Sequence, residues 1–223
     1  MADKILFSWS GGKDSALALH RALHDERYEV AGLLTTVNEV YRRISMHGVL
    51  ESLLEQQANS IGLPMHRVYV PDNSSNEEYE ARMERALLEH TKNGVTAVAF
   101  GDIFLFEIKK YREGNLARIG MKGVFPLWGK TDCYKDFIKL GFKAIVASAD
   151  AKLLDGTFVG RMFDSRFIDE LPGKVDPNGE NGEFHTFVFD GPIFKRAIPY
   201  RLGEVVQRDG FYYCDIQPSS ANK

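Results

Sequence analysis

The chain has 223 residues, of which 44% are hydrophobic and 26% charged, and its formal net charge is −3. This length supports one substantial core or two smaller ones, and the composition is that of a globular protein. A negative net charge excludes an overall basic surface, so we do not expect a nucleic acid partner. The only cysteines, Cys133 and Cys214, exclude a disulfide framework and a four-cysteine zinc site, and they fit free thiols in a reducing compartment.

The N-terminal residues lead directly into a strand-like apolar segment and lack the hydrophobic stretch of a secretion signal. No apolar run approaches the roughly 18 residues of a membrane-spanning helix. We therefore expect a cytoplasmic protein that does not enter the membrane.

Strand-like and helix-like segments alternate through the first half of the chain. Short apolar runs predict strands at residues 4–9, 30–36, 65–70, 95–100 and 122–127. Longer segments with a helical apolar face, or ended by helix-stopping residues such as Asn93-Gly94, predict helices at residues 14–26, 48–61, 76–92 and 104–119. Such alternation predicts an α/β fold, in which helices cover both faces of a parallel sheet.

The usual strand order of such a sheet is 3-2-1-4-5, and ligands bind at the carboxyl ends of the strands where this order reverses. The first and fourth strands are neighbours at that point. We therefore expect the segment that follows the first strand to meet Gly101 and Asp102, which follow the fourth.

The pattern changes near residue 130. Helices near 132–140 and 164–171, a strand at 143–148, a polar glycine-rich loop at 173–182 and two or three further strands predict a smaller α+β domain. The last strands include a hairpin at 207–213 with an Asp-Gly turn. We expect two domains, residues 1–129 and 130–223, and a disordered tail over Pro218–Lys223.

The most informative segment, Ser10-Gly11-Gly12-Lys13-Asp14-Ser15, lies between the first strand and the first helix. Its glycines allow a tight turn and a close approach of the backbone to a ligand. Successive N–H groups at a helix N-terminus bind anions, and Lys13 adds a positive charge. The spacing is not that of the P-loop that grips β and γ phosphates. This segment predicts a site for a phosphate chain, since a simple turn does not require Lys13 and Asp14.

Further candidates lie at the same edge of the predicted sheet. Ser8 is close enough to the strand end to reach a phosphate, and Thr35 and Thr36 end the second strand, where adenine lies in related folds. Asp102 would hold Mg²⁺ or the nucleotide, or else cap the next helix. His47 has the same two interpretations, a site residue or a cap.

A second polar cluster lies where the glycine-rich loop enters a strand. Its candidate substrate-binding residues are Glu180, Asn181, Gly182, Glu183, His185 and Thr186. Such a set would form a rim that binds an amine, a carboxylate or a metal ion. The alternative is an exposed loop of turn-forming residues.

Together, the Ser10–Ser15 segment, Gly101-Asp102-Ile103 and the cluster near residue 180 resemble the diphthine–ammonia ligase family. This family belongs to the ATP pyrophosphatases, whose Rossmann-like fold is of the HUP type. Its second signature is Glu-Gly-Gly-Glu, then an aromatic residue, a variable residue and Thr. Asn181 replaces the first of those glycines, and the matching residues are Glu180, Gly182, Glu183, Phe184 and Thr186.

The resemblance implies an ATP-dependent ligase that activates a carboxylate as an acyl-adenylate and amidates it with ammonia, releasing AMP and pyrophosphate. In the family the carboxylate is that of a modified histidine on an elongation factor. Lys13 and the loop around it would hold the pyrophosphate, and Asp102 would hold Mg²⁺. Glu180 and Glu183 would orient ammonium and take its proton. A homodimer is compatible with this interpretation.

Two alternatives stay open. One is an adenylating enzyme with a different small-molecule or RNA acceptor, although thiolation would need more than two unpaired cysteines. The other is a nucleotide-binding regulator without turnover, against which the presence of Lys13, Asp14, Glu180 and Glu183 argues.

Overall fold

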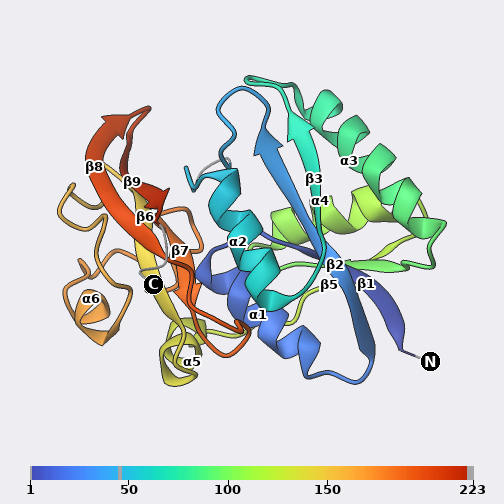
Figure 1. Cartoon of the computed structure of the whole chain (residues 1–223), viewed down its shortest axis with the longest axis horizontal. Coiled ribbons are helices and arrows are strands. Elements are labelled where there is room, and N and C mark those ends of the chain that lie inside the picture. The colour runs from blue at the N-terminus through green and yellow to red at the C-terminus, as the bar shows by residue number, and fades with distance from the viewer. Residues whose placement is uncertain (1, 45–46, 220–223) are drawn as a thin grey trace.

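A computed structural model describes residues 2–44 and 47–219 of the chain, which form two sheets placed side by side (Figure 1). The larger sheet is parallel and has the strand order β3-β2-β1-β4-β5, which confirms the predicted 3-2-1-4-5 order. Its strands are β1 (Asp3–Ser8), β2 (Tyr28–Asn38), β3 (Met65–Val70), β4 (Ala97–Ala99) and β5 (Lys122–Val124).

Helices cover both faces of this sheet because successive residues of its strands point to opposite sides. Phe7 of β1 packs in the core that includes residues of α1 (Lys13–Leu23) and α2 (Glu51–Ile61). Its neighbour Leu6 packs in a second core, with α3 (Asn76–Thr91) and α4 (Phe106–Ala117). Among the described residues, no helix is both long and apolar enough to cross a membrane.

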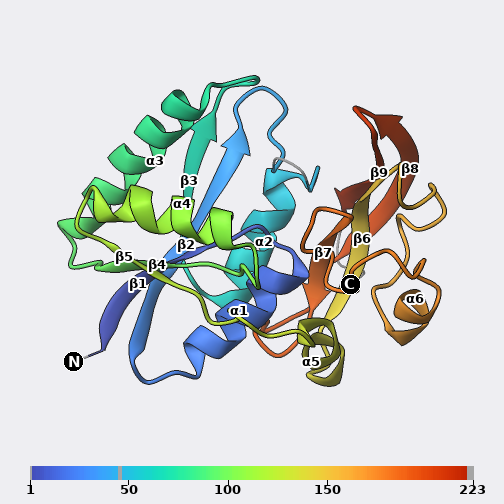
Figure 2. The same cartoon turned by 180° about the vertical axis from the view of Figure 1, so that it is seen from behind.

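The second sheet is antiparallel, with the order β7-β6-β9-β8, and belongs to the smaller C-terminal unit (Figure 2). Its elements are α5 (Cys133–Lys139), β6 (Lys143–Asp150), α6 (Ser165–Asp169), β7 (Phe184–Asp190), β8 (Tyr200–Arg208) and β9 (Phe211–Pro218). The predicted hairpin turn lies at Asp209-Gly210, both with positive φ. The expectation of disorder from Pro218 was wrong at that residue, which pairs with Tyr200; residues 220–223 lie outside the described part.

The two sheets meet where β7 contacts the segment that follows β1. The N–H of Val188 donates to the carbonyl of Gly11 at 2.9 Å. Gln57 of α2 is fully buried, and its Nε2 donates to both Gly11 O and Val188 O, at 3.1 and 2.6 Å. One hydrophobic core continues across both sheets. The glycine loop is therefore held by hydrogen bonds from both α2 and β7. The expected domain boundary at 129/130 stays a prediction.

Candidate functional site

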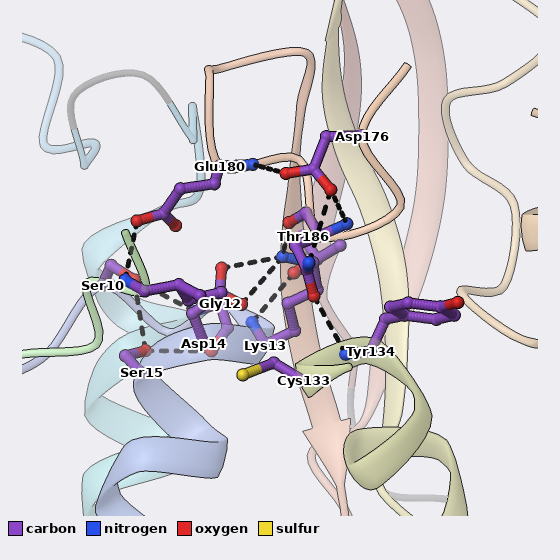
Figure 3. A network of polar contacts seen from close by, with 12 residues as sticks. Ser10, Gly12, Lys13, Asp14, Ser15, Cys133, Tyr134, Asp176, Glu180 and Thr186 are labelled. Carbon is purple, nitrogen blue, oxygen red and sulfur yellow. Dashed lines mark hydrogen bonds and ion pairs between the residues drawn. The ribbon is translucent and has the colours of Figure 1, made fainter. Parts of the chain in front are cut away.

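The glycine loop between β1 and α1 is a tight turn closed by its own hydroxyl groups (Figure 3). Gly11 has a φ of 77°, a conformation that favours glycine. The Gly12 N–H donates to Ser10 Oγ at 3.3 Å, Ser10 Oγ donates to Ser15 Oγ at 3.2 Å, and Ser15 Oγ donates to Gly12 O at 2.9 Å. Gly12 is the N-cap of α1, so the loop lies at the positive end of that helix.

Lys13 is buried between the two units, with 4% of its surface exposed. Its Nζ lies 2.7 and 2.9 Å from the carboxylate oxygens of Asp14 and donates to the carbonyl of Asn178. The ammonium also lies 5.5 Å from the ring centroid of Phe184. Burial raises the pKa of Asp14, and the charge of Lys13 opposes that rise. Lys13 therefore places a positive charge where the loop meets the C-terminal unit.

Thr186 and His47 line the loop on its C-terminal side. The Lys13 N–H donates to Thr186 Oγ1 at 2.9 Å, and His47 Nδ1 lies 3.3 Å from Thr186 O. A Cβ atom on Gly12 would lie 2.8 Å from His47 Cε1 and 3.1 Å from Thr186 O, so a side chain there would displace the His47 ring or crowd that carbonyl. Burial lowers the pKa of His47 to about 4, and the charge of Lys13 acts in the same direction. The ring of His185 lies beside that of His47, with centroids 4.5 Å apart.

The carboxylate of Glu183 accepts hydrogen bonds from its own loop, residues 176–183. Glu183 is 4% exposed, and it accepts from the Asp176 N–H at 3.2 Å and from both the N–H and the Nδ2 of Asn181 at 3.0 Å. Asn181, which stands where the family signature has glycine, thus adds a hydrogen bond that glycine cannot make. Gly182 completes the turn with a φ of 86°. The geometry gives Glu183 an organising role in the 176–183 loop.

The sequence analysis did not single out Asp176 or Asn178. Asp176 Oδ1 accepts from the Asn178 N–H at 3.0 Å, and Asp176 Oδ2 from the Glu180 N–H at 3.3 Å. Asn178 is buried; its Nδ2 donates to Thr131 O at 2.9 Å, and its Oδ1 accepts from the Tyr134 N–H at 3.1 Å. These contacts fix the carbonyl that holds Lys13. The Asp-Pro-Asn-Gly turn sequence was the available signal.

Glu180 approaches the loop that follows β4. Its Oε1 accepts from the Ile103 N–H at 2.7 Å. Burial raises the pKa of Glu180 to about 7, and the charges of Asp14 and Asp102 add to the rise against the opposing Ile103 hydrogen bond and Lys13 charge. Gly101 packs on the start of α1: a Cβ atom there would lie 2.9 Å from Ser15 N. The expected meeting of the glycine loop with the segment after β4 is confirmed at Gly101.

Asp102 already has a partner. Its carboxylate lies 2.8 Å from Arg112 Nε, and its side chain is 13% exposed. Carboxylate oxygens are suitable Mg²⁺ ligands, but Arg112 at Asp102 and Lys13 at Asp14 compete for them. Within residues 2–44 and 47–219, no group of three or more His, Cys, Asp or Glu residues could hold a metal ion. The carboxylates of Asp14 and Asp102 therefore do not make a metal site by themselves. They fit a cation that arrives bound to the phosphates of a ligand better.

The other predicted residues flank the loop on the sheet side. Ser8 ends β1 and pairs with Leu34, so Thr35 and Thr36 extend past the end of β1 on the neighbouring strand. Thr35 Oγ1 is buried and has no hydrogen-bond partner among the described residues. An orphaned hydroxyl at this edge is available to a ligand that lies across the carboxyl end of β1.

A groove of about 540 Å³ lies between Arg43 and Gly48 on one side and the β8–β9 hairpin on the other. Arg43 lines it, donating to Gly48 O at 2.6 Å and pairing with Asp215 at 2.8 Å. Arg201 and Arg208 of β8 also line it. Ligand sites commonly lie at such junctions between units.

Curated proteins with similar sequences include several named diphthine–ammonia ligase. The protein from Schizosaccharomyces pombe is 25% identical over 243 residues, which cover 99% of this chain and 40% of that protein. The proteins from Rattus norvegicus and Homo sapiens are each 26% identical, covering 88% of this chain and 82% of the relative. The chain thus spans less than half of the yeast protein and most of the mammalian ones.

Family profiles match nearly the whole chain. The profile of the diphthamide synthase N-terminal domain matches residues 3–123, which contain the glycine loop and Gly101-Asp102. That of the diphthamide synthase C-terminal domain matches residues 130–220, which contain the 176–186 segment. The chain therefore belongs to the diphthamide synthase family, and the curated relatives that it matches are ligases by name.

Proposed function

We propose that the protein is an ATP-dependent ligase that joins ammonia to a carboxylate, forming an amide, AMP and pyrophosphate. The names of the relatives support diphthine, the modified histidine of an elongation factor, as the acceptor. The observation that carries the proposal is the contact of the glycine loop with the 176–186 segment. Through Lys13, Thr186 and Asn178, an anion-binding helix end and a carboxylate-rich loop share one site.

The first step would activate the acceptor. An oxygen of its carboxylate attacks the α phosphorus of ATP, the bond from that phosphorus to the bridging oxygen breaks, and pyrophosphate leaves. Residues Ser10 to Ser15 bind the departing phosphates, and Lys13 offsets their growing charge. Asp102 or Asp14 would help to hold Mg²⁺ there, and the ion would supply further charge neutralisation. The product is an acyl-adenylate.

The second step would use the acyl-adenylate. The nitrogen of ammonia attacks the carbonyl carbon, the bond to the AMP oxygen breaks, and one proton leaves the nitrogen. Glu180 is the residue suited to take that proton, because a carboxyl group whose pKa is near 7 exchanges protons at neutral pH. Glu183 keeps the 176–183 loop in place around it.

The acceptor would approach through the groove between Arg43 and the β8–β9 hairpin. Three arginines, Arg43, Arg201 and Arg208, outnumber its two acidic residues, Glu204 and Asp215, so it favours a ligand that carries a carboxylate. Gly48, which follows His47 in the chain, lines this groove, and a Cβ atom there would lie only 2.9 Å from the ring of Tyr213.

The products distinguish this proposal from terminal phosphoryl transfer. With ATP, ammonium and a diphthine-bearing elongation factor, we expect AMP and pyrophosphate in equal amounts, and amide only when ammonium is present. Chromatography of the nucleotides and mass spectrometry of the acceptor measure this. ADP as the sole nucleotide product would contradict the mechanism. If AMP forms only with another carboxylate, the proposed acceptor is wrong and the proposed chemistry stands.

The Glu183→Gln variant tests the organising role of Glu183. A glutamine keeps one acceptor oxygen but turns an NH₂ group toward N–H donors, so the 176–183 loop loses hydrogen bonds. We expect ATP binding to persist, amide formation to fall by about tenfold to a hundredfold, and the pH profile of the residual activity to be unchanged. Calorimetry with ATP and amide yield across pH measure these effects. An unaltered rate would remove Glu183 from the site.

A further inference from the structure

The His47–His185 pair has no role in the steps above. His47 precedes α2, His185 is the second residue of β7, and their rings are 4.5 Å apart at an interplanar angle of 33°. His47 lies against Gly12 and contacts the carbonyl of Thr186. The pair is therefore adjacent to the glycine loop.

His185 carries a polar atom that needs a partner. Its Nε2 is buried and has no hydrogen-bond partner in the described part of the chain. Buried polar atoms in native proteins are paired with protein groups, ordered water or ligand, so this nitrogen indicates a missing partner. Burial, with the charges of His47 and Lys13 acting in the same direction, lowers the pKa of His185 well below its ordinary value. The ring is neutral and has one donor and one acceptor nitrogen.

We propose that the His47–His185 pair is part of the nucleotide site, and that His185 Nε2 donates a hydrogen bond to a phosphate oxygen of ATP bound on the Ser10–Ser15 loop. This proposal rests on the proposed use of ATP. Two features favour a phosphate over the carboxylate substrate as the partner: a Cβ atom added to Gly12 would lie 2.8 Å from His47 Cε1, so the ring is next to the loop, and the Lys13 charge acts on both rings. A second cation beside Lys13 would bind the leaving pyrophosphate more tightly. A neutral imidazole can donate to a phosphate oxygen without that effect.

The chain supplies internal controls. His20 of α1 and His24, the residue that caps its C-terminus, have ring centroids 4.3 Å apart, and those of His66 and His90 are 4.2 Å apart. Like the candidate pair, they are neighbouring imidazoles, but neither contacts the glycine loop in any described interaction. A spectroscopic change confined to the candidate pair would therefore report the nucleotide rather than ring pairing.

The test uses the full chain labelled with ¹⁵N-histidine and titrated with ATP, then with inorganic pyrophosphate. We expect the Nε2 resonance of His185 to shift with ATP, that of His47 to follow, and those of the other four histidines to remain. ATP binding detected by calorimetry without a shift at His185 would overturn the proposal and would indicate that water satisfies the nitrogen. No ATP binding at all would overturn both this proposal and the proposed function.

A variant measures the size of the effect. His185→Phe replaces the imidazole with a flat carbon ring and so removes both nitrogens, and we expect ATP to bind at least tenfold more weakly, as for loss of a hydrogen bond to a charged group. His66→Phe is the matched control and should bind ATP as the parent does. Equal affinities in the folded His185→Phe variant and the parent would overturn the proposal. If His185→Phe does not fold, the titration of the parent chain decides.

Discussion

Replacing Lys13 with methionine is expected to lower kcat/KM for AMP formation by at least a hundredfold, on the order of 10² to 10³. Methionine fills similar space but has no charge to offset the pyrophosphate as it leaves. The loss should lie mainly in kcat, because the leaving group gains charge in the transition state. Initial rates of AMP release at several ATP concentrations measure it.

This variant also affects stability, because Lys13 is buried and pairs with Asp14 and with the carbonyl of Asn178. Removing the ammonium leaves Asp14 without its partner, so we expect a lower melting temperature. The double variant Lys13→Met/Asp14→Asn should recover part of the stability and none of the activity. Lys109→Met is the matched control, since Lys109 pairs with Glu113 and lies over the Phe125 ring, away from the loop. A folded Lys13→Met protein with a tenth or more of the parent rate would contradict the role.

The sheet could be predicted from the sequence because its central strands are apolar runs and its order follows a general rule of parallel sheets. Strand ends depend instead on pairing. β2 extends from Tyr28 to Asn38, beyond the apolar run at 30–36, because its first residues pair with β1 and its last with β3. β4 shortens to Ala97–Ala99, the residues that pair with both β1 and β5.

One part of the site could be predicted from the general rule for strand order in parallel sheets. The meeting of Ser10–Ser15 with Gly101 follows from strand order alone. The contacts of Lys13 with Asn178 and Thr186 join residues 165 and 173 positions apart, and no local pattern encodes them. Glu183 was expected, together with Glu180, to orient ammonium and take its proton. β7 begins only at Phe184, however, and Glu183 instead turns into its own loop.

Glu180 and Glu183, for which the sequence predicts the same role, therefore differ in their surroundings. Glu180 has one oxygen on the Ile103 N–H, is half-buried, and has its pKa raised to about 7 by burial. Both oxygens of Glu183 accept from its own loop. A group that takes a proton from the attacking nitrogen must be ionised near neutral pH and must retain a free lone pair. Glu180 keeps more of its lone pairs free than Glu183 does, which favours Glu180 as the base.

The Glu180→Gln variant is accordingly expected to lose amide formation by about 10² to 10⁴-fold while still binding ATP. In the parent, the carboxylate is the active form, so the rate at constant free ammonia should rise with pH through about 7 and then level. Glutamine does not titrate, so this limb should be absent from the residual activity of Glu180→Gln and present in Glu183→Gln. Amide yield by mass spectrometry, at ammonium concentrations adjusted for each pH, measures both.

Hydroxylamine separates proton removal from a loss of geometry. It is a nucleophile that is largely uncharged at neutral pH and depends less than ammonium on a base. If Glu180 acts on the proton, hydroxylamine should restore much of the rate of Glu180→Gln, measured as hydroxamate formed with AMP. If Glu180 only holds the 101–104 loop through Ile103, both nucleophiles should fail equally. An unchanged pH limb in Glu180→Gln would assign the base to another residue.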